Sequence, residues 1–248
     1  MSDERHETHD AFAVHTFGHA AGIVMTCEHA SERVPEAFAQ NTGFAWPEAD
    51  RWLRGTHWSY DLGAEEIALA HARAVGATLV CARFSRLLID PNRPLDASTL
   101  FRDVAEGRAI TMNRDLSARA RQARIEQLYE PFHDAVDRAV AASTKADIVF
   151  AVHTFTHEYE GQRRTLELGV LFDREDALGA RVLEGLRAAG FDAAANEPWS
   201  GKAGLIHVAS HHGDRYGKRA LELEVRQDLA TNAAFRARLV SVLADLLR

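Results

Sequence analysis

The chain has 248 residues, a net charge of −7 and the composition of an ordinary soluble globular protein, which fits one α/β domain over residues 1–248 with a flexible tail over 1–12. Its basic residues are scattered, so no nucleic-acid partner is expected, and no apolar stretch approaches the roughly 20 residues that span a bilayer. The polar start lacks the apolar core of a secretion signal and favours a cytoplasmic location, while nothing predicts the oligomeric state.

Short apolar runs rich in β-branched residues are typical of strands buried on both faces; they lie at 22–27, 78–84, 147–152, 167–172, 205–209 and 220–225. Segments with helical spacing lie between or after them, at 61–76, 117–143, 173–190 and 232–247. Pro131 should kink or split the second helix, and Ser117 is its candidate cap. This alternation predicts a three-layer αβα sandwich around a mostly parallel, mixed sheet.

In open α/β sheets, ligands bind beyond the carboxyl ends of the strands. Polar residues gather at these points: Glu28 and His29, then Arg86, Asp90, Asn92 and Arg93, then His153, and finally Glu222 and Glu224. Asp61 opens the first long helix, where it could also act only as a cap. Buried carboxylates such as Glu222 and Glu224 are costly unless they are paired or bind a metal. The joint pattern favours a single site, and the long irregular segment 84–116 is expected to contribute to it.

The chain's two cysteines, Cys27 and Cys81, each lie within an apolar strand-like run. A disulfide between them is not expected in a reducing compartment. Both are interpreted as small buried residues, although Cys27 remains a candidate reactive thiol.

Motifs along most of the chain resemble the N-formylglutamate amidohydrolase family: "TCEHASERVP", "WSYDLGAEEIA", "SRLLIDPNRP", "VHTFTHEY", "NEPW" and "LELEVRQDL", in the family's order over residues 26–229. The resemblance implies a zinc exopeptidase/phosphorylase-hydrolase-like fold, which carboxypeptidases and deacylases such as aspartoacylase share. It also implies a zinc-dependent hydrolase of a small-molecule N-acyl amino acid, with N-formyl-L-glutamate as the named substrate. Glu32 and Trp199 depart from the family, where Asn and Tyr are frequent, and the second change could alter the substrate pocket.

Given this resemblance, the expected ligands of a Zn²⁺ cofactor are His29, Asp61 and His153, with a further position open to water. Glu28 is the alternative to Asp61. Neighbouring residues of an extended chain point in opposite directions, so Glu28 and His29 would need a turn to share one metal. This consideration favours Asp61.

The remaining chemistry needs an acid–base group and cationic partners for the substrate. Glu224 is the expected general base, and Arg86 is expected to stabilise the oxyanion. Asn92 and Arg93 are expected to bind the α-carboxylate, because a guanidinium grips carboxylates through two parallel hydrogen bonds.

Weaker candidates surround this set. Arg226 and Lys202 could bind the second carboxylate of formylglutamate, and His212 could line the mouth or stabilise the transition state. Asn196 and Glu197 could order the same rim.

Other functions remain open at this stage. The substrate could be another N-acyl amino acid, or the chain could be a non-catalytic binding protein on the same fold. The joint presence of His29, Asp61, His153 and Glu224 argues against a decayed site. A thiol hydrolase using Cys27 is a third possibility, and metal content separates it from the zinc enzyme.

Overall fold

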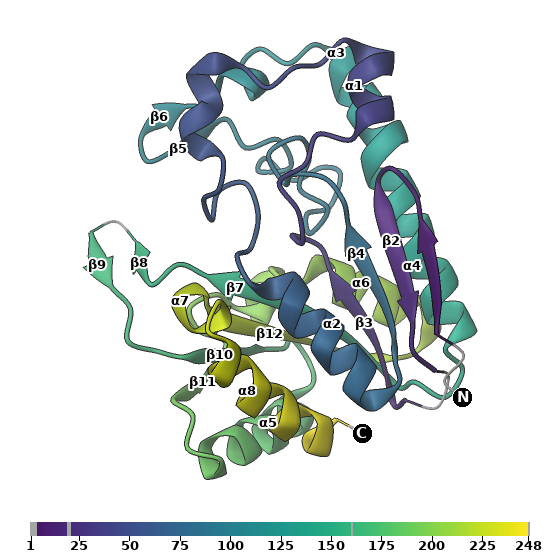
Figure 1. Ribbon diagram of the computed structural model, residues 1–248, viewed down its shortest axis with the longest axis vertical. Helices are drawn as coiled ribbons and strands as arrows, with labels where there is room; N and C mark the ends of the chain where they lie inside the picture. Colours follow the sequence, from purple (N-terminus) through teal and green to yellow (C-terminus); the bar gives the residue numbers. More distant parts are fainter. Residues whose placement is uncertain (1–3, 19–20, 160, 248) are drawn as a thin grey trace.

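The computed structural model describes residues 4–18, 21–159 and 161–247. One eight-stranded sheet forms its centre, in the order β1-β2-β4-β3-β7-β12-β10-β11 (Figure 1). The strands are β1 Arg5–Thr8, β2 Phe12–Thr16, β3 Ile23–Cys27, β4 Thr78–Ala82, β7 Ile148–Phe155, β10 Leu168–Leu171, β11 Ala193–Ala195 and β12 Arg219–Arg226. Two small hairpins lie outside it, β5 Val104–Ala105 with β6 Arg108–Ala109 and β8 Glu158–Tyr159 with β9 Gln162–Arg163.

The helices are α1 Glu36–Thr42, α2 Ala64–Val75, α3 Ala118–Arg124, α4 Glu130–Ala142, α5 Asp176–Ala188, α6 His207–Tyr216, α7 Gln227–Ala230 and α8 Ala233–Leu246. Short 3-10 turns occupy η1 Glu48–Leu53, η2 Thr111–Asn113 and η4 Gly201–Ala203, and η3 Ile125–Tyr129 is a π-helical turn. No helix in the described ranges combines the length and apolarity that a bilayer span requires.

The sheet is buried on both faces, as the near-continuous apolar strands predicted. Along β3, Ile23 and Met25 pack with α2, α5 and α8 on one side, whereas Val24 packs with α4 and α6 on the other. The four central strands β4, β3, β7 and β12 run parallel, and β1 and β2 pair antiparallel with their neighbours. Strand β10 pairs antiparallel with β12 and parallel with β11. The predicted three-layer sandwich with a mostly parallel, mixed sheet is confirmed.

The ends of the long helical segment 117–143 follow local chemistry. Ser117 caps α3 by accepting a hydrogen bond from the amide of Ala120 at 3.2 Å, as predicted. The segment divides at η3, directly before Pro131, which stands in the first turn of α4 where a missing amide hydrogen costs least. The predicted interruption is therefore present as a π-helical turn.

Some sequence predictions were wrong. Residues 205–209 do not form a strand, because the apolar residues Val208 and Ala209 belong to the buried face of α6, which continues to His212 and packs on β7 and β12. The expected flexible tail over 1–12 holds strand β1, whose backbone pairs with β2; residues 1–3 of that expectation lie outside the described ranges. The short strand β11 was not predicted.

Candidate active site

Strand ends and one turn bring the polar residues of the site together. β3 ends at Cys27, and Glu28 and His29 form a turn beyond its carboxyl end. On the parallel neighbours β7 and β12, His153 stands in register with Glu224. Residues far apart in the chain therefore meet at one edge of the sheet, where open α/β folds bind their ligands.

Asp61 joins this group through its backbone and its side chain. Its amide donates to the carbonyl of His29 at 2.9 Å, and its Oδ2 accepts from Nδ1 of His153 at 3.0 Å and from the amide of Thr154 at 3.1 Å. The carboxylate does not cap α2, whose N-cap residue is Gly63 and which has no side-chain cap. The alternative reading of Asp61 as a helix cap is therefore wrong.

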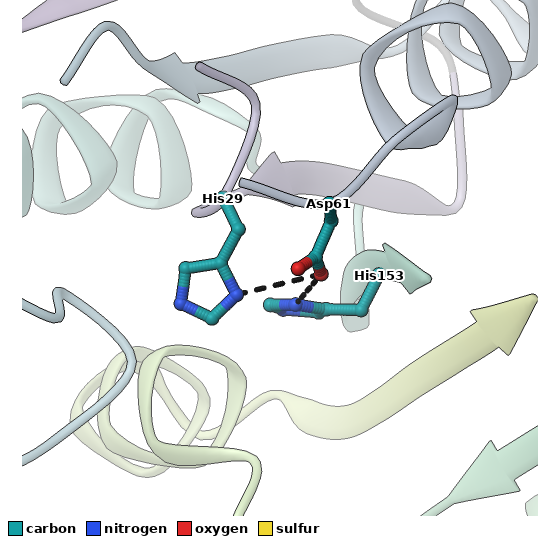
Figure 2. Close-up of side chains that lie close together, drawn as sticks. All are labelled: His29, Asp61 and His153. Carbon is teal, nitrogen blue, oxygen red and sulfur yellow. Dashed lines mark hydrogen bonds and ion pairs between the residues drawn. The ribbon is translucent and has the colours of Figure 1, made fainter. Parts of the chain in front are cut away.

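His29, Asp61 and His153 form a compact, buried group (Figure 2). One ligand-type atom of each lies within 4.8 Å of the other two. Nδ1 of His29 lies 3.4 Å, and Nδ1 of His153 3.0 Å, from the same Oδ2 of Asp61. Within the described part of the chain, Nδ1 of His29 has no hydrogen-bond partner. Imidazole nitrogen and carboxylate oxygen are the donors that zinc prefers, so these three residues could hold a metal ion.

The other ring nitrogen of each histidine meets a further carboxylate. Nε2 of His29 lies 2.7 Å from Oδ1 of Asp90, and Nε2 of His153 lies 2.8 Å from Oε2 of Glu28. Metal-binding histidines usually have such an outer partner, which fixes the ring and strengthens the inner nitrogen as a ligand. The turn after β3 does let Glu28 and His29 both approach His153, but Glu28 meets the ring nitrogen that faces away from Asp61.

The charges of this group are unbalanced without a cation. Buried carboxylates of Asp61, Asp90, Glu28, Glu222 and Glu224 stand against the single guanidinium of Arg86 and two histidines. Burial lowers the pKa of His153, but Glu222 and Glu28 outweigh it and raise that pKa well above its usual value. Burying carboxylates is costly unless a positive charge compensates them. A divalent cation would supply that charge, so the donor set fits a metal.

A pocket of about 320 Å³ adjoins the three residues, and Glu222 and Glu224 line it. Burial raises the pKa of Glu222 to about 7 and that of Glu224 well above its usual value; the charge of Glu28 adds to the first shift and that of Glu222 to the second. Oε2 of Glu224 has no hydrogen-bond partner among the described residues. A carboxylate oxygen without such a partner, on a residue that lines the pocket beside a candidate metal group, is the arrangement that a general acid–base residue requires.

Three predicted residues of segment 84–116 also line the pocket. Arg86 donates to Asp61 Oδ1 at 3.3 Å and to Asp90 Oδ2 at 2.7 Å. Asn92 ties the loop to its surroundings, because its Oδ1 accepts from the amide of Val208 at 3.0 Å. Among the described residues, the guanidinium of Arg93 donates only to the carbonyl of Asn92, at 2.8 Å, so most of its hydrogen-bonding capacity is available to a ligand.

Two of the predicted binding residues lie outside the pocket. His212 is buried on α6, where its Nδ1 is 2.7 Å from Asp137 and its Nε2 2.9 Å from His133. Arg226 makes an ion pair with Asp228 and donates to the carbonyl of Thr165 at 2.5 Å. Neither side chain lines the pocket, because other parts of the chain occupy both.

Asn196 of the "NEPW" motif does not line the pocket; its side chain instead fixes the local backbone. Oδ1 of Asn196 accepts from the amides of Phe172 at 3.2 Å and Gly201 at 2.8 Å. Glu197 is exposed, and Lys202 pairs with Asp176 at 2.8 Å. Of this group, Trp199 alone reaches the pocket, and that residue is the one where the family often has Tyr.

Several other pocket residues carry no sequence signal that would select them. Arg102, Arg164, His57, Trp58 and Tyr159 line the pocket together with the predicted residues. Arg164 follows the hairpin β8–β9, and Arg102 stands two residues before β5. Polar loops of this kind are usually solvated surface, and only their tertiary position reveals otherwise.

The thiol alternative loses support. Cys27 and Cys81 are both free and buried. A hydrogen bond with Cys81 and then burial raise the pKa of the Cys27 thiol well above its usual value. Nucleophilic cysteines need the opposite shift, because the thiolate is the reactive form.

Comparisons with known proteins agree with this geometry. The family model described as N-formylglutamate amidohydrolase matches residues 21–231. The crystal structure of gene product Atu2144 from Agrobacterium tumefaciens is 30% identical, with a TM-score of 0.82, and the match covers 96% of this chain and 93% of that one.

An N-formylglutamate amidohydrolase from Ralstonia eutropha JMP134 has the same fold, with a TM-score of 0.73 at 23% identity, over 97% of this chain and 99% of that one. A comparison with curated protein sequences finds no match. The family match spans most of the chain and includes every strand of the site, so the chain is a hydrolase that belongs to the N-formylglutamate amidohydrolase family.

Proposed function

We propose that this hydrolase is a zinc-dependent amidohydrolase that cleaves N-formyl-L-glutamate to formate and glutamate. The proposal rests on one observation above all: His29 and His153 both turn Nδ1 towards Asp61 and both place Nε2 against a further carboxylate. In this role His29, Asp61 and His153 hold the metal. A zinc ion bound there would polarise the acyl carbonyl and make a water molecule acidic near neutral pH.

Glu224 moves the protons of the reaction. Its free Oε2 takes a proton from the attacking water as the water oxygen bonds to the formyl carbon. It then delivers that proton to the amide nitrogen, so that the C–N bond breaks and glutamate leaves as an amine. The raised pKa of Glu224 in the metal-free protein supports a side chain that can hold a proton between the two steps.

Arg86 and Arg93 interact with two different groups of the substrate. Arg86 is fixed by Asp61 and Asp90 beside the metal group, so it can stabilise negative charge that develops on the formyl oxygen. Arg93 has free donors on the pocket wall and binds the α-carboxylate, which positions the scissile amide.

The test is release of formate and glutamate from N-formyl-L-glutamate by purified protein, measured before and after removal of metal with a chelator and again after addition of zinc. Activity that disappears and returns supports the proposal. Hydrolysis of N-acetyl or N-succinyl amino acids in preference to the formyl compound would instead identify a different deacylase. Full zinc binding without turnover of any of these compounds would indicate a binding protein.

A further inference from the structure

Beyond the candidate metal group, the wall of the active-site pocket is rich in arginine. Four guanidiniums line it, those of Arg86, Arg93, Arg102 and Arg164. Arg86 is paired with Asp61 and Asp90. Within the described part of the chain, the other three form no ion pair, although the chain as a whole carries a net charge of −7. Unpaired cations around a small pocket are a site for an anionic ligand.

Arg164 is held in place by aromatic rings. Its guanidinium carbon lies 4.7 Å from the centroid of Tyr159 and 5.2 Å from that of Trp199, and these two rings meet edge to face at 6.0 Å. Its Nη1 also donates to the carbonyl of Thr156 at 3.3 Å. A long side chain restrained in this way loses little conformational freedom when it binds a ligand, so its charge is prepared for a carboxylate.

The backbone that carries Arg164 is itself anchored. Arg226 reaches the carbonyl of Thr165 with Nη1 at 2.5 Å, while its Nε bonds Asp228 at 2.8 Å. The amide of Arg164 donates to the carbonyl of His157 at 2.9 Å. Arg226 therefore fixes the segment after β9, and the arginine that reaches the pocket from that segment is Arg164.

Arg93 and Arg102 add two further guanidiniums to the pocket wall. Arg102 stacks over Trp58, with 5.4 Å between guanidinium carbon and ring centroid. Burial and then the charge of Arg86 lower the pKa of Arg102, and Arg93 acts in the same direction. Burial lowers the pKa of Arg164, and Tyr159 and then Glu224 oppose that shift. The pocket wall thus receives cations from segment 84–116 and from the segment after β9.

We propose that Arg164 binds a second carboxylate of the substrate, the side-chain carboxylate of an N-acyl dicarboxylic amino acid, and so makes the site selective for dianionic substrates. The inference rests on the proposed function, in which Arg93 binds the α-carboxylate. It assigns to Arg164 the task that the sequence suggested for Arg226 and Lys202.

The test compares N-formyl-L-glutamate with N-formyl-L-glutamine, which replaces the side-chain carboxylate by an amide of the same shape. For the zinc-loaded parent we expect kcat/KM to favour the acid about 100-fold or more, since an unpaired charged group in a site is strongly penalised. Arg164→Gln should bring this ratio close to one by slowing only the acid. Arg163→Gln, an exposed neighbour on β9 that does not line the pocket, is the matched control and should keep the parent ratio.

Equal losses on both substrates would overturn the inference, because Arg164 would then act on the fold or the reaction and not on the carboxylate. An unchanged ratio would overturn it as well. Arg164→Gln could instead abolish a preference for N-succinyl over N-butyryl amino acids and leave the glutamate–glutamine ratio intact. That result would overturn the inference, because the carboxylate bound by Arg164 would then belong to the acyl group.

A binding measurement separates this inference from the proposed function. Calorimetry with glutarate and with its monoamide needs no turnover. If the parent hydrolyses neither formyl compound, the proposed function fails; tighter binding of glutarate, lost in Arg164→Gln and kept in Arg163→Gln, would still support the carboxylate subsite. Equal affinity of parent and Arg164→Gln for glutarate would exclude it.

Discussion

Oδ1 of Asp90 lies 2.7 Å from Nε2 of His29, while its Oδ2 lies 2.7 Å from Nη2 of Arg86. One carboxylate thus fixes the ring of a candidate metal ligand and the guanidinium proposed to stabilise the oxyanion. Burial would raise the pKa of Asp90, but Arg86 and then His29 hold it well below its usual value, so the carboxylate is ionised. Because Oδ1 of Asp90 also accepts from the amide of Asn92 at 3.0 Å, the same carboxylate ties the Asn92 loop to the candidate metal group.

Asp90→Asn should weaken zinc binding by about 10–100-fold, because a neutral amide is a poorer outer partner for the His29 imidazole. Competition with a chelating dye measures the affinity. Asp96→Asn changes an exposed residue of the same loop and is the control. Unchanged zinc affinity in Asp90→Asn would show that Asp90 serves Arg86 alone.

Glu224→Gln should keep the metal and lose most turnover, since an amide cannot take the proton of water. A positioned acid–base group typically contributes about 10²–10⁴ in rate. Metal content and single-turnover rates are the measurements. The companion variant is Glu222→Gln, whose carboxylate already accepts from Nδ2 of Asn92 at 3.4 Å and should matter less for proton transfer. Near-normal turnover by Glu224→Gln would transfer the role to Glu222 or Glu28.

His153→Ala should abolish stoichiometric zinc binding, because it removes one of the three candidate ligands, His29, Asp61 and His153. Elemental analysis of metal-replete protein gives the occupancy. His211→Ala, an exposed histidine on α6, controls for adventitious binding. Full occupancy in His153→Ala would exclude His153 from the ligand set.

Much of the site was predictable because it follows local pattern. His29, Asp90 and Asn92 come directly after apolar runs, and strands in a parallel sheet end at a shared edge. Glu224 was conspicuous as a carboxylate inside an apolar strand. These signals depend only on neighbours in the sequence and on the general geometry of the sheet.

The rest depended on contacts between distant segments. Arg164 belongs to a polar hairpin that reads as solvated surface until Trp199, from a different loop, is placed beside it. Asn196 stands in a family motif, yet it adopts a left-handed conformation with φ of 53°, and its side chain accepts from the amides of Phe172 and Gly201. His212 was interpreted as a residue of the pocket mouth because helix α6 was not predicted. The residues next to Arg164, Asn196 and His212 in the sequence do not reveal which of the three reaches the pocket.

Arg93 should discriminate the α-carboxylate of the substrate. N-formylglutamate and its α-amide are compared in the parent, in Arg93→Ala and in Arg93→Lys. The parent should strongly prefer the free acid, and both variants should lose that preference, because an ammonium cannot reproduce the two-pronged contact. Turnover should fall along with affinity, since this contact positions the scissile bond. Equal discrimination by parent and Arg93→Ala would assign the α-carboxylate to another arginine.

His71 should make the fold sensitive to mild acid. It is fully buried in α2 against the ring of Phe150, neither ring nitrogen has a hydrogen-bond partner among the described residues, and burial lowers its pKa to about 4. The unfolded chain binds this proton near pH 6.5, so unfolding takes up a proton between pH 6.5 and 4 and stability falls as pH falls. The loss approaches about 3 kcal/mol at pH 4 and is absent above pH 7.

His71→Leu should remove this dependence, because leucine fills a similar volume and cannot be protonated. The measurement is urea unfolding of parent and variant in chelator at pH 7.5, 6 and 5, and the quantity compared is the difference in unfolding free energy at each pH. Contributions from other histidines cancel in that difference. We expect the unfolding free energy of the variant to rise steadily relative to that of the parent below pH 6.5. The unfolding free energy of His211→Leu, a change at an exposed position, should follow that of the parent. A constant difference between His71→Leu and parent across this range would contradict the prediction, because it would show that His71 has the same pKa in the folded and unfolded states.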